Sequence, residues 1–214
     1  MNLQLYFSPG ACSFVPHVAL EVAKAPFEPK LVKLHKKEQF APEYLALNPN
    51  GQVPVLVVDG KPLTQIMAIV GFMVREFPQA GLLPADPWAR AQAVSELSWM
   101  NTTPHPTATR FFYPDRYAES EAGRAEVKKR AAEEFRGYLE RVQGMIAGAA
   151  PYWLGERISF HDAYAFTLLR WGGFAGIDPR GFPAYKAYAE CVMQAPPVAA
   201  ALARERISLD TYKG

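Results

Sequence analysis

The chain has few of the residues that build disulfides and metal sites. Its 214 residues include two cysteines, Cys12 and Cys191, and four histidines. Two cysteines are too few for a disulfide framework, so reduced cytosolic thiols are the natural interpretation. Because cysteine and histidine do not cluster anywhere, the sequence predicts no metal site.

The sequence also lacks an excess of charge and a long apolar run. The 23 basic and 21 acidic residues leave a net charge of +2, which gives no hint of attraction to nucleic acid or to a membrane. No apolar stretch approaches the ~20 residues of a membrane span. The first residues, "MNLQLYF", do not have the charged start of a signal peptide. We therefore expect a soluble, cytoplasmic protein that binds neither nucleic acid nor membranes.

The first eighty residues alternate between strand and helix patterns. Short apolar runs predict strands, and apolar residues at helical spacing predict helices. The predicted elements are a strand at 3–7, a helix from Phe14 to about Lys24, a strand at 27–34, a helical turn at 42–49, a hairpin at 52–64 around Asp59-Gly60 and a helix at 65–77. The order βαβαββα describes a small sheet with helices.

A proline-containing stretch then separates this part from a helical one. Beyond it the patterns favour helices at 88–103, 121–148, 161–174 and 182–194, with no convincing strand. The sequence therefore predicts an α/β domain at 1–79, a linker at 80–87 and an all-helical domain at 88–214.

Cys12 lies directly before the first predicted helix. A helix N-terminus presents unpaired N–H groups and the positive end of the helix dipole, so it stabilises a thiolate and lowers the thiol pKa. The residue three positions on is Val15, so no CxxC dithiol is present. The alternative is a buried, inert cysteine that packs like a small hydrophobic residue.

The segment "NPNGQVPVL", residues 48–56, predicts a turn followed by a strand. Pro54 holds Val53 extended and cannot donate a hydrogen bond to a neighbouring strand. The backbone groups of Val53 are then open to another extended peptide. An ordinary edge strand that contains a proline is the alternative.

Three segments together resemble the bacterial glutathione S-transferases, closest to the beta class. These are "YFSPGACSFVPHVAL", "YLALNPNGQVPVL" and "LTQIMAI", and the helical half agrees through "NTTPHPTATRFFYPDRY" and "GERISFHDAYAF". The resemblance covers nearly the whole chain. It implies a thioredoxin-like first domain, an all-helical second domain, a role in detoxification and a homodimer. It also implies glutathione as a co-substrate, bound over the N-terminus of the first helix, and no metal.

The resemblance also assigns roles to single residues. Cys12 and Ser13 would lie beside the glutathione sulfur, and His105 would reach the active site from the helical domain. Lys36 or its neighbour Lys37 would meet the glycyl carboxylate. The remaining glutathione-binding positions are Gln52, Val53, Pro54 in the cis form, Gln65 and Ile66.

Two of these positions depart from the family pattern, which has an acidic residue and then a small one after Leu-Thr. Here Gln65 brings no charge for the γ-glutamyl ammonium, and Ile66 has no hydroxyl. A charge-assisted hydrogen bond contributes about 1.5–3 kcal/mol and a neutral one about 0.5–1.5 kcal/mol. A loss of about 1–2 kcal/mol would weaken binding by about 5–30-fold.

Several other residues have both a functional and a structural interpretation. Arg110, Phe112, Tyr164 and Trp171 could wall a pocket for the co-substrate, or the aromatic ones could belong to the core. Pro104 and Pro106 limit the backbone around His105 and fix its direction. We interpret His17 and His161 as structural, Ser159 and Asp162 as a capping box, and Cys191 as a core residue.

The sequence thus predicts a glutathione transferase that activates the thiol of glutathione for attack on a small apolar electrophile. Thiol-disulfide exchange through Cys12 is a second mode of the same site. The alternative from another class is a non-catalytic binding or interaction protein with this fold and an altered ligand, which Gln65 and Ile66 favour. A third hypothesis is an isomerase or dehalogenase that uses glutathione.

Overall fold

A mixed four-stranded sheet organises the first part of the protein. The computed structural model describes residues 1–213. The strands are β1 (Leu3–Phe7), β2 (Glu28–Leu31), β3 (Val55–Val58) and β4 (Lys61–Thr64), in the order β2-β1-β3-β4. β1 pairs with β2 in parallel and with β3 antiparallel, and β3 and β4 form the predicted hairpin. Strands β1 and β3 carry the buried residues Leu5, Val55 and Leu56, which explains their central places.

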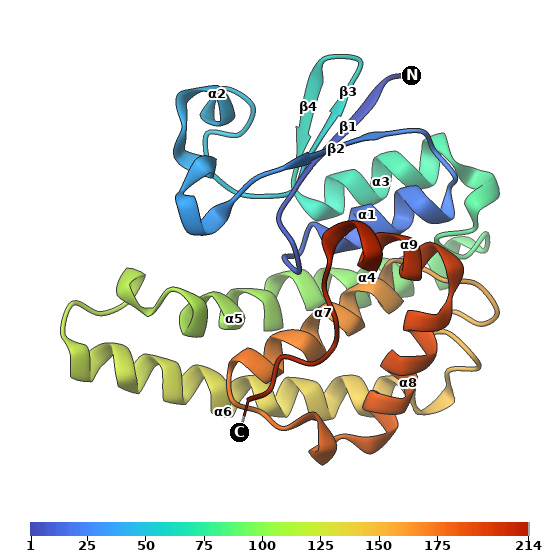
Figure 1. Ribbon diagram of the computed structural model, residues 1–214. Helices are drawn as coiled ribbons and strands as arrows, with labels where there is room; N and C mark the ends of the chain where they lie inside the picture. Colours follow the sequence, from blue (N-terminus) through green and yellow to red (C-terminus); the bar gives the residue numbers. More distant parts are fainter. Residues whose placement is uncertain (214) are drawn as a thin grey trace.

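Two helices lie between this sheet and the helical part (Figure 1). They are α1 (Phe14–Val22) and α3 (Ile66–Glu76). The short α2 (Pro42–Leu45) stands apart from them, after the 3₁₀ turns η1 (Leu34–Lys36) and η2 (Glu38–Phe40). The order and the sheet confirm the predicted βαβαββα arrangement.

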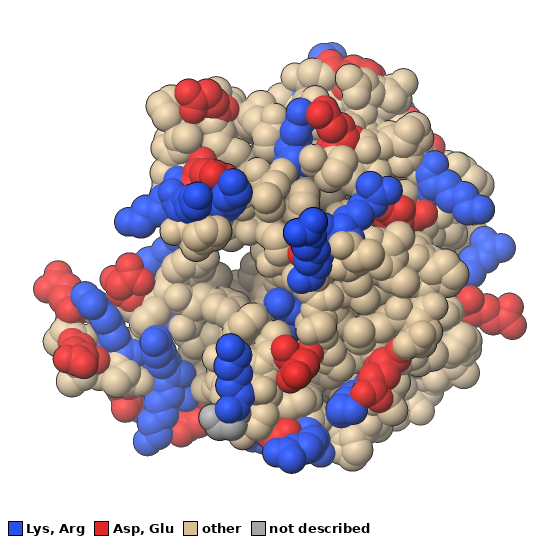
Figure 2. Space-filling view, viewed as in Figure 1, with Lys and Arg blue, Asp and Glu red and all other residues tan. Residues whose placement is uncertain are grey.

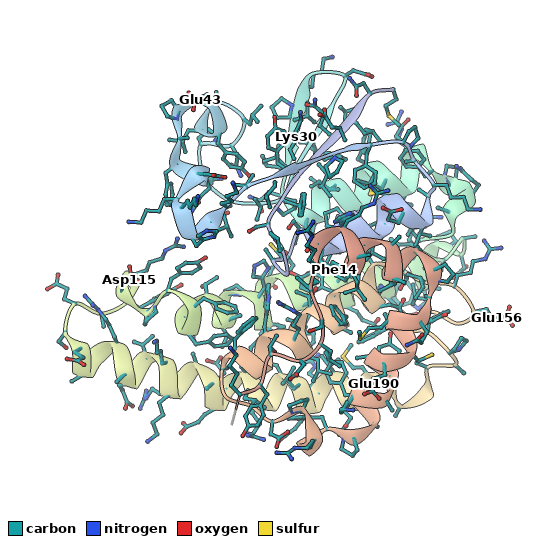
Figure 3. The ribbon with its side chains drawn as sticks, viewed as in Figure 1. Phe14, Lys30, Glu43, Asp115, Glu156 and Glu190 are labelled. Atoms are coloured by element: carbon teal, nitrogen blue, oxygen red, sulfur yellow. The ribbon has the colours of Figure 1, made fainter. Side chains whose placement is uncertain are left out.

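The second part is built from helices around one buried helix. Its elements are α4 (Pro87–Thr102), α5 (Pro104–Phe112), α6 (Glu121–Met145), α7 (Phe160–Phe174), α8 (Pro183–Gln194) and α9 (Pro196–Glu205). Nearly every residue of α7 is buried, because α1, α4, α6 and α8 all pack against it. Figure 3 shows the labelled Phe14 where α1 meets the helices, and its ring lies 5.2 Å from that of Phe166. The two parts therefore share one continuous core.

Two helices and one cysteine differ from the predictions. The sequence analysis missed α5 and α9 as separate helices, although each begins with proline, which fits the first turn of a helix. Cys191, predicted to be a core residue, is exposed. Helix α8 buries Tyr188, Ala189 and Val192, and the helical period turns Cys191 away from that face. No helix among residues 1–213 is long and apolar enough to cross a membrane.

The predicted capping box is present at the start of α7. The Asp162 carboxylate, fully buried, accepts hydrogen bonds from Ser159 N at 2.7 Å and from Ser159 Oγ at 2.6 Å. Its other oxygen accepts from Trp153 N at 2.8 Å and from the Tyr188 hydroxyl. One carboxylate thus joins the start of the central helix to the preceding loop and to α8. As predicted, His161 is structural: it is buried and bonds Ala93 O at 2.9 Å.

We predict that Asp162→Ala lowers the free energy of unfolding by about 3 kcal/mol or more, because it leaves several buried donors unpaired. Urea unfolding followed by circular dichroism measures the loss. The control is Ser120→Ala, which removes a single exposed capping bond to Gly123 N and should cost about 1 kcal/mol. Equal effects of the two substitutions would contradict a central role for the buried carboxylate.

Candidate functional site

A cavity of about 550 Å³ lies between the sheet-containing part and the helices. Figure 2 shows the molecular surface hollowed between these two parts, with Lys and Arg side chains near its edge. The loop after β1, the turn before β3 and the start of α3 form one wall, and α5 and the end of α7 form the other. Lining residues include Cys12, Val53, Gln65, His105 and Trp171. Residues far apart in the sequence therefore meet here, as the resemblance implied.

The peptide groups of Gly10 are held from the helical part. Gly10 N donates to Glu205 Oε2 at 2.8 Å, and Trp171 Nε1 donates to Gly10 O at 2.9 Å. The other oxygen of Glu205 contacts His17 Nδ1 at 2.7 Å, with both side chains fully buried. Gly10 has φ +68°, and a Cβ there would lie 2.2 Å from Arg170 Nη1. Glycine suits this position because it adopts a positive φ without strain, and a larger residue would also displace the Arg170 guanidinium. The loop before Cys12 is held by α7 and α9, and His17 supports Glu205 from α1, so His17 is structural as predicted.

The structure contradicts the expected low pKa of Cys12. The thiol is 7% exposed, and burial raises its pKa to about 12. The N–H groups of Cys12 and Ser13 lower the pKa, as the helix-end argument requires, but by less than burial raises it. Cys12 Sγ donates a hydrogen bond to Val53 O at 3.3 Å, which also favours the protonated form. In the free protein Cys12 is therefore a thiol and not a thiolate.

Ser13 lies beneath the loop and does not line the cavity. Its hydroxyl donates to Ser8 O at 3.2 Å and accepts from Ser8 N at 3.1 Å, and the residue is fully buried. Ser8 itself lines the cavity. The side chain of Ser13 thus shapes the loop, whereas its backbone N–H faces the sulfur of Cys12.

The turn before β3 is held by side chains that leave Val53 accessible. Tyr44 Oη and Asn48 Nδ2 both donate to Gln52 O at 2.7 Å. The Val53–Pro54 bond is cis, and Val53 lines the cavity while Pro54 is buried. The only bond to Val53 O among the described residues comes from Cys12. The backbone of Val53 is thus placed where an extended peptide could meet it.

His105 is neutral at physiological pH and is joined to the helical core through Tyr164. Burial lowers its pKa to about 4, which makes it a weak base. His105 Nδ1 lies 2.8 Å from Tyr164 Oη, and either atom can be the donor of this bond. Tyr164 Oη also lies 3.2 Å from Asn101 Oδ1. Since His105 lines the cavity, this site offers a neutral imidazole as a hydrogen-bond partner for a ligand.

The other predicted glutathione-binding residues divide into two groups. Gln52 and Gln65 line the cavity, and Gln65 precedes α3 with φ +70°. Ile66 is buried and begins α3, so only its backbone could reach a ligand. Lys36, in η1, and Lys37, which follows it, are both exposed and do not line the cavity. In the sequence they lie between Leu34 and Gln39, which do line it.

The predicted co-substrate residues are similarly divided. Phe112 and Trp171 line the cavity, with ring centroids 5.8 Å apart. Tyr164 is fully buried behind His105 and serves the hydrogen-bond network described above. Arg110 is not part of the lining, because its guanidinium pairs with Glu134 at 2.9 Å.

Sequence reasoning missed Gln39, Asn101 and Arg170, which also line the cavity. Gln39 is 5% exposed, and its Oε1 has no hydrogen-bond partner among the described residues. Asn101 lies in the motif that contains His105, and its role depends on the contact with Tyr164 from α7. Arg170 lies in the helix predicted at 161–174, beside Trp171, but a helical pattern assigns no role to a single arginine. Gln39 stands in a segment for which no motif predicts a function.

Comparison with protein families gives two matches that together cover more than half of the chain. The family described as glutathione S-transferase, N-terminal domain, matches residues 1–75. The family described as glutathione S-transferase, C-terminal domain, matches residues 100–196.

Three individual proteins are similar over nearly the full length. A glutathione S-transferase of Xanthomonas campestris is 34% identical over 96% of this chain and 100% of its own. The structure of a glutathione transferase homolog from Sulfitobacter with bound glutathione has a TM-score of 0.88 and 30% identity, covering 96% of this chain and 99% of that one. A beta-class enzyme of Sphingomonas chungbukensis has a TM-score of 0.82 and 32% identity, covering 94% and 98%.

We predict slow alkylation of Cys12 in the free protein. With a pKa of about 12, the thiolate fraction and the alkylation rate should rise about tenfold per pH unit from pH 7 to pH 10, without a plateau. Exposed Cys191 is the internal control and should react first. Mass spectrometry after timed iodoacetamide treatment separates the two sites. A plateau for Cys12 below pH 9 would show that the helix end outweighs burial.

Proposed function

The chain belongs to the glutathione S-transferase family, and from this premise we propose an enzyme that activates the thiol of glutathione for attack on a small electrophile. The observation that carries the proposal is the meeting of three groups in one cavity. These are the N–H groups at the start of α1, the accessible backbone of Val53 and the neutral imidazole of His105. Together they can position a thiol and stabilise its anion through hydrogen bonds.

The tripeptide would lie along the wall formed by the sheet-containing part. Val53 would pair with its cysteinyl backbone, in place of the bond that Val53 O accepts from Cys12. Gln65 and the backbone of Ile66 would meet the γ-glutamyl end. Lys36 or Lys37 would attract the glycyl carboxylate, and the unpartnered Gln39 Oε1 could accept a hydrogen bond from a glutathione N–H. All of these groups border the same cavity or the turn next to it.

The chemistry would begin with loss of the glutathione proton. The N–H groups of Cys12 and Ser13 would favour the thiolate, and the proton would pass to solvent. Neutral His105 would be a hydrogen-bond partner of the sulfur or of a water beside it. The sulfur would then form a bond to the electrophilic carbon while the leaving group departs with its electron pair. Trp171 and Phe112 would hold the apolar body of the electrophile.

Cys12 could also take part covalently, as a second mode. It would attack a glutathionyl disulfide, form a mixed disulfide with glutathione and release the other half as a thiolate. Its burial makes this mode slow unless the ligand first displaces the thiol from Val53 O.

The competing proposal is a binding or interaction protein without turnover. Gln65 and Ile66, which lack the usual acidic and small side chains, favour it, and so does the protonated Cys12. We retain the enzyme as the leading proposal because Cys12, Val53 and His105 line one cavity that has room for a second ligand.

We further propose a cytoplasmic homodimer with a role in detoxification, and domain limits at 1–79 and 88–214 around the linker 80–87.

We predict that Gln65→Glu tightens glutathione binding by about 5–30-fold, because a carboxylate replaces a neutral acceptor for the γ-glutamyl ammonium. Isothermal calorimetry with reduced glutathione measures the change. Gln79→Glu, which adds the same charge in an exposed turn outside the cavity, is the control. An unchanged affinity of Gln65→Glu would mean that the γ-glutamyl end lies elsewhere. If neither the wild type nor Gln65→Glu binds glutathione, the result would favour the non-catalytic proposal.

We predict that Cys12→Ala separates the two modes. Conjugation of glutathione to 1-chloro-2,4-dinitrobenzene, followed by absorbance, should persist within about tenfold of the wild type, since the glutathione thiol is the nucleophile. Mixed-disulfide formation with oxidised glutathione, followed by mass, should disappear from this site. If conjugation is lost completely while the melting temperature is unchanged, Cys12 would instead be essential to both modes.

A further inference from the structure

The charged side chains that line the cavity are of one sign. Arg116 and Arg170 belong to the lining, and no aspartate or glutamate among the described residues does. The aromatic lining residues gather on the same side, from α5, η4 (Pro114–Arg116) and the end of α7: they are Phe112, Tyr113, Tyr117, Trp171 and Phe174. This half of the cavity therefore combines an apolar surface with an excess of positive charge.

Arg170 carries donors that the described residues leave free. Its Nε donates to Ser208 O at 2.8 Å, and its guanidinium carbon lies 5.0 Å from the ring centre of Phe174. No hydrogen bond or ion pair within residues 1–213 uses Nη1 or Nη2. Nη1 stands against Gly10, two residues before Cys12. The free donors thus lie close to the proposed reaction centre.

No carboxylate among residues 1–213 contacts this guanidinium directly. Glu205 influences Arg170 electrostatically, but its two oxygens are bound to His17 Nδ1 and Gly10 N. By contrast Arg110, which does not line the cavity, is paired with Glu134. Arg116 is exposed at the cavity edge and stacks over Tyr113 at 4.3 Å without an ion pair among the described residues. Asp115, labelled in Figure 3, is exposed and does not line the cavity.

We propose that the co-substrate is an electrophile with an aromatic or other apolar body and an anionic group, such as a carboxylate, bound by the free N–H groups of Arg170. This inference rests on the proposed transferase function and names the substrate class of the same site. Arginine presents parallel donors that match a carboxylate, and such bonds are among the strongest in proteins. Arg116 at the edge would attract the anion as it enters. Glutathione itself would use the opposite wall, with Val53, Gln65 and the lysines near η1.

Two probes that share one reactive ring, of which one is an anion and the other neutral, test this inference. They are 4-chloro-3,5-dinitrobenzoate and its methyl ester. In both, the glutathione sulfur bonds to the ring carbon, chloride leaves with the electron pair of its bond, and the thiol proton passes to solvent. The measured quantity is kcat/KM for the acid divided by kcat/KM for the ester, at saturating glutathione. The intrinsic reactivity of the two rings cancels when this ratio is compared between proteins.

We predict that Arg170→Gln lowers the acid-to-ester ratio by at least about tenfold, the effect of losing a charge-assisted pair. Arg170→Lys keeps the charge without the paired donors, so its acid-to-ester ratio should lie between those of the wild type and Arg170→Gln. The control is Arg130→Gln, which removes an exposed arginine paired with Glu126 on α6 and should leave the ratio unchanged. Melting temperatures show whether each variant is folded. An unchanged ratio in a folded Arg170→Gln would overturn the inference.

A binding measurement decides the question independently of turnover. The protein, saturated with glutathione, is titrated in a calorimeter with 4-nitrobenzoate or with 4-nitrobenzamide. The two dissociation constants compare an anion with its neutral analogue. We expect at least about tenfold tighter binding of the benzoate by the wild type, a smaller preference in Arg170→Lys, which keeps the charge, and loss of the preference in Arg170→Gln. If neither dinitro probe is turned over, the transferase proposal fails. A preference for benzoate that depends on Arg170 would still support the anion site in that case. Equal binding of benzoate and benzamide by the wild type would overturn the inference of an anion site.

Discussion

The fixed peptide of Gly10 is the constraint on which the rest of the site depends. Its N–H is bound by Glu205 and its C=O by Trp171, so two helices of the second part hold a loop of the first. The bonds are buried, and each partner left unpaired would cost about 1–3 kcal/mol. Cys12 follows two residues later and α1 begins four residues later, at Phe14. The arrangement therefore places the sulfur and the N–H groups beside it, and it brings Gly10 against the guanidinium of Arg170.

Cys12 illustrates how magnitudes decide between two opposing effects. A helix end stabilises an anion by about 0.3–1 kcal/mol, and by up to ~2 kcal/mol in a partly buried site. Burial that raises the thiol pKa from 9.0 to about 12 corresponds to about 4 kcal/mol. Burial therefore dominates in the free protein. A glutathione thiol held against the same N–H groups in the open cavity would be less desolvated than the buried cysteine and would therefore be the more suitable nucleophile.

Local patterns were enough to predict much of the fold, because strands, the Asp59-Gly60 hairpin and the capping box are encoded within a few residues. Cys12, Val53, Gln65 and His105 were found through motifs, and the structure brings them into one cavity. Arg110 and Tyr164 show the limit: their partners, Glu134 and His105, lie 24 and 59 residues away. Cys191 shows a second limit, because the apolar pattern of a helix locates its buried face less accurately than the packing of the helix in the structure does. Arg170 gave no signal, because its role depends on contacts with Gly10 and Phe174.

The bond between Gly10 and Glu205 spans 195 residues, and this has a consequence for how the protein is made. Chains are synthesised from the N-terminus at about 5–20 residues per second, and N-terminal domains generally fold first. The carboxylate that holds Gly10 is therefore added roughly 10–40 s after the glycine itself, at that rate. The sheet and its hairpin can form on the ribosome during that interval. The loop before Cys12 reaches its final form only after α9 has emerged, so a nascent chain cannot carry a complete site before that helix is available.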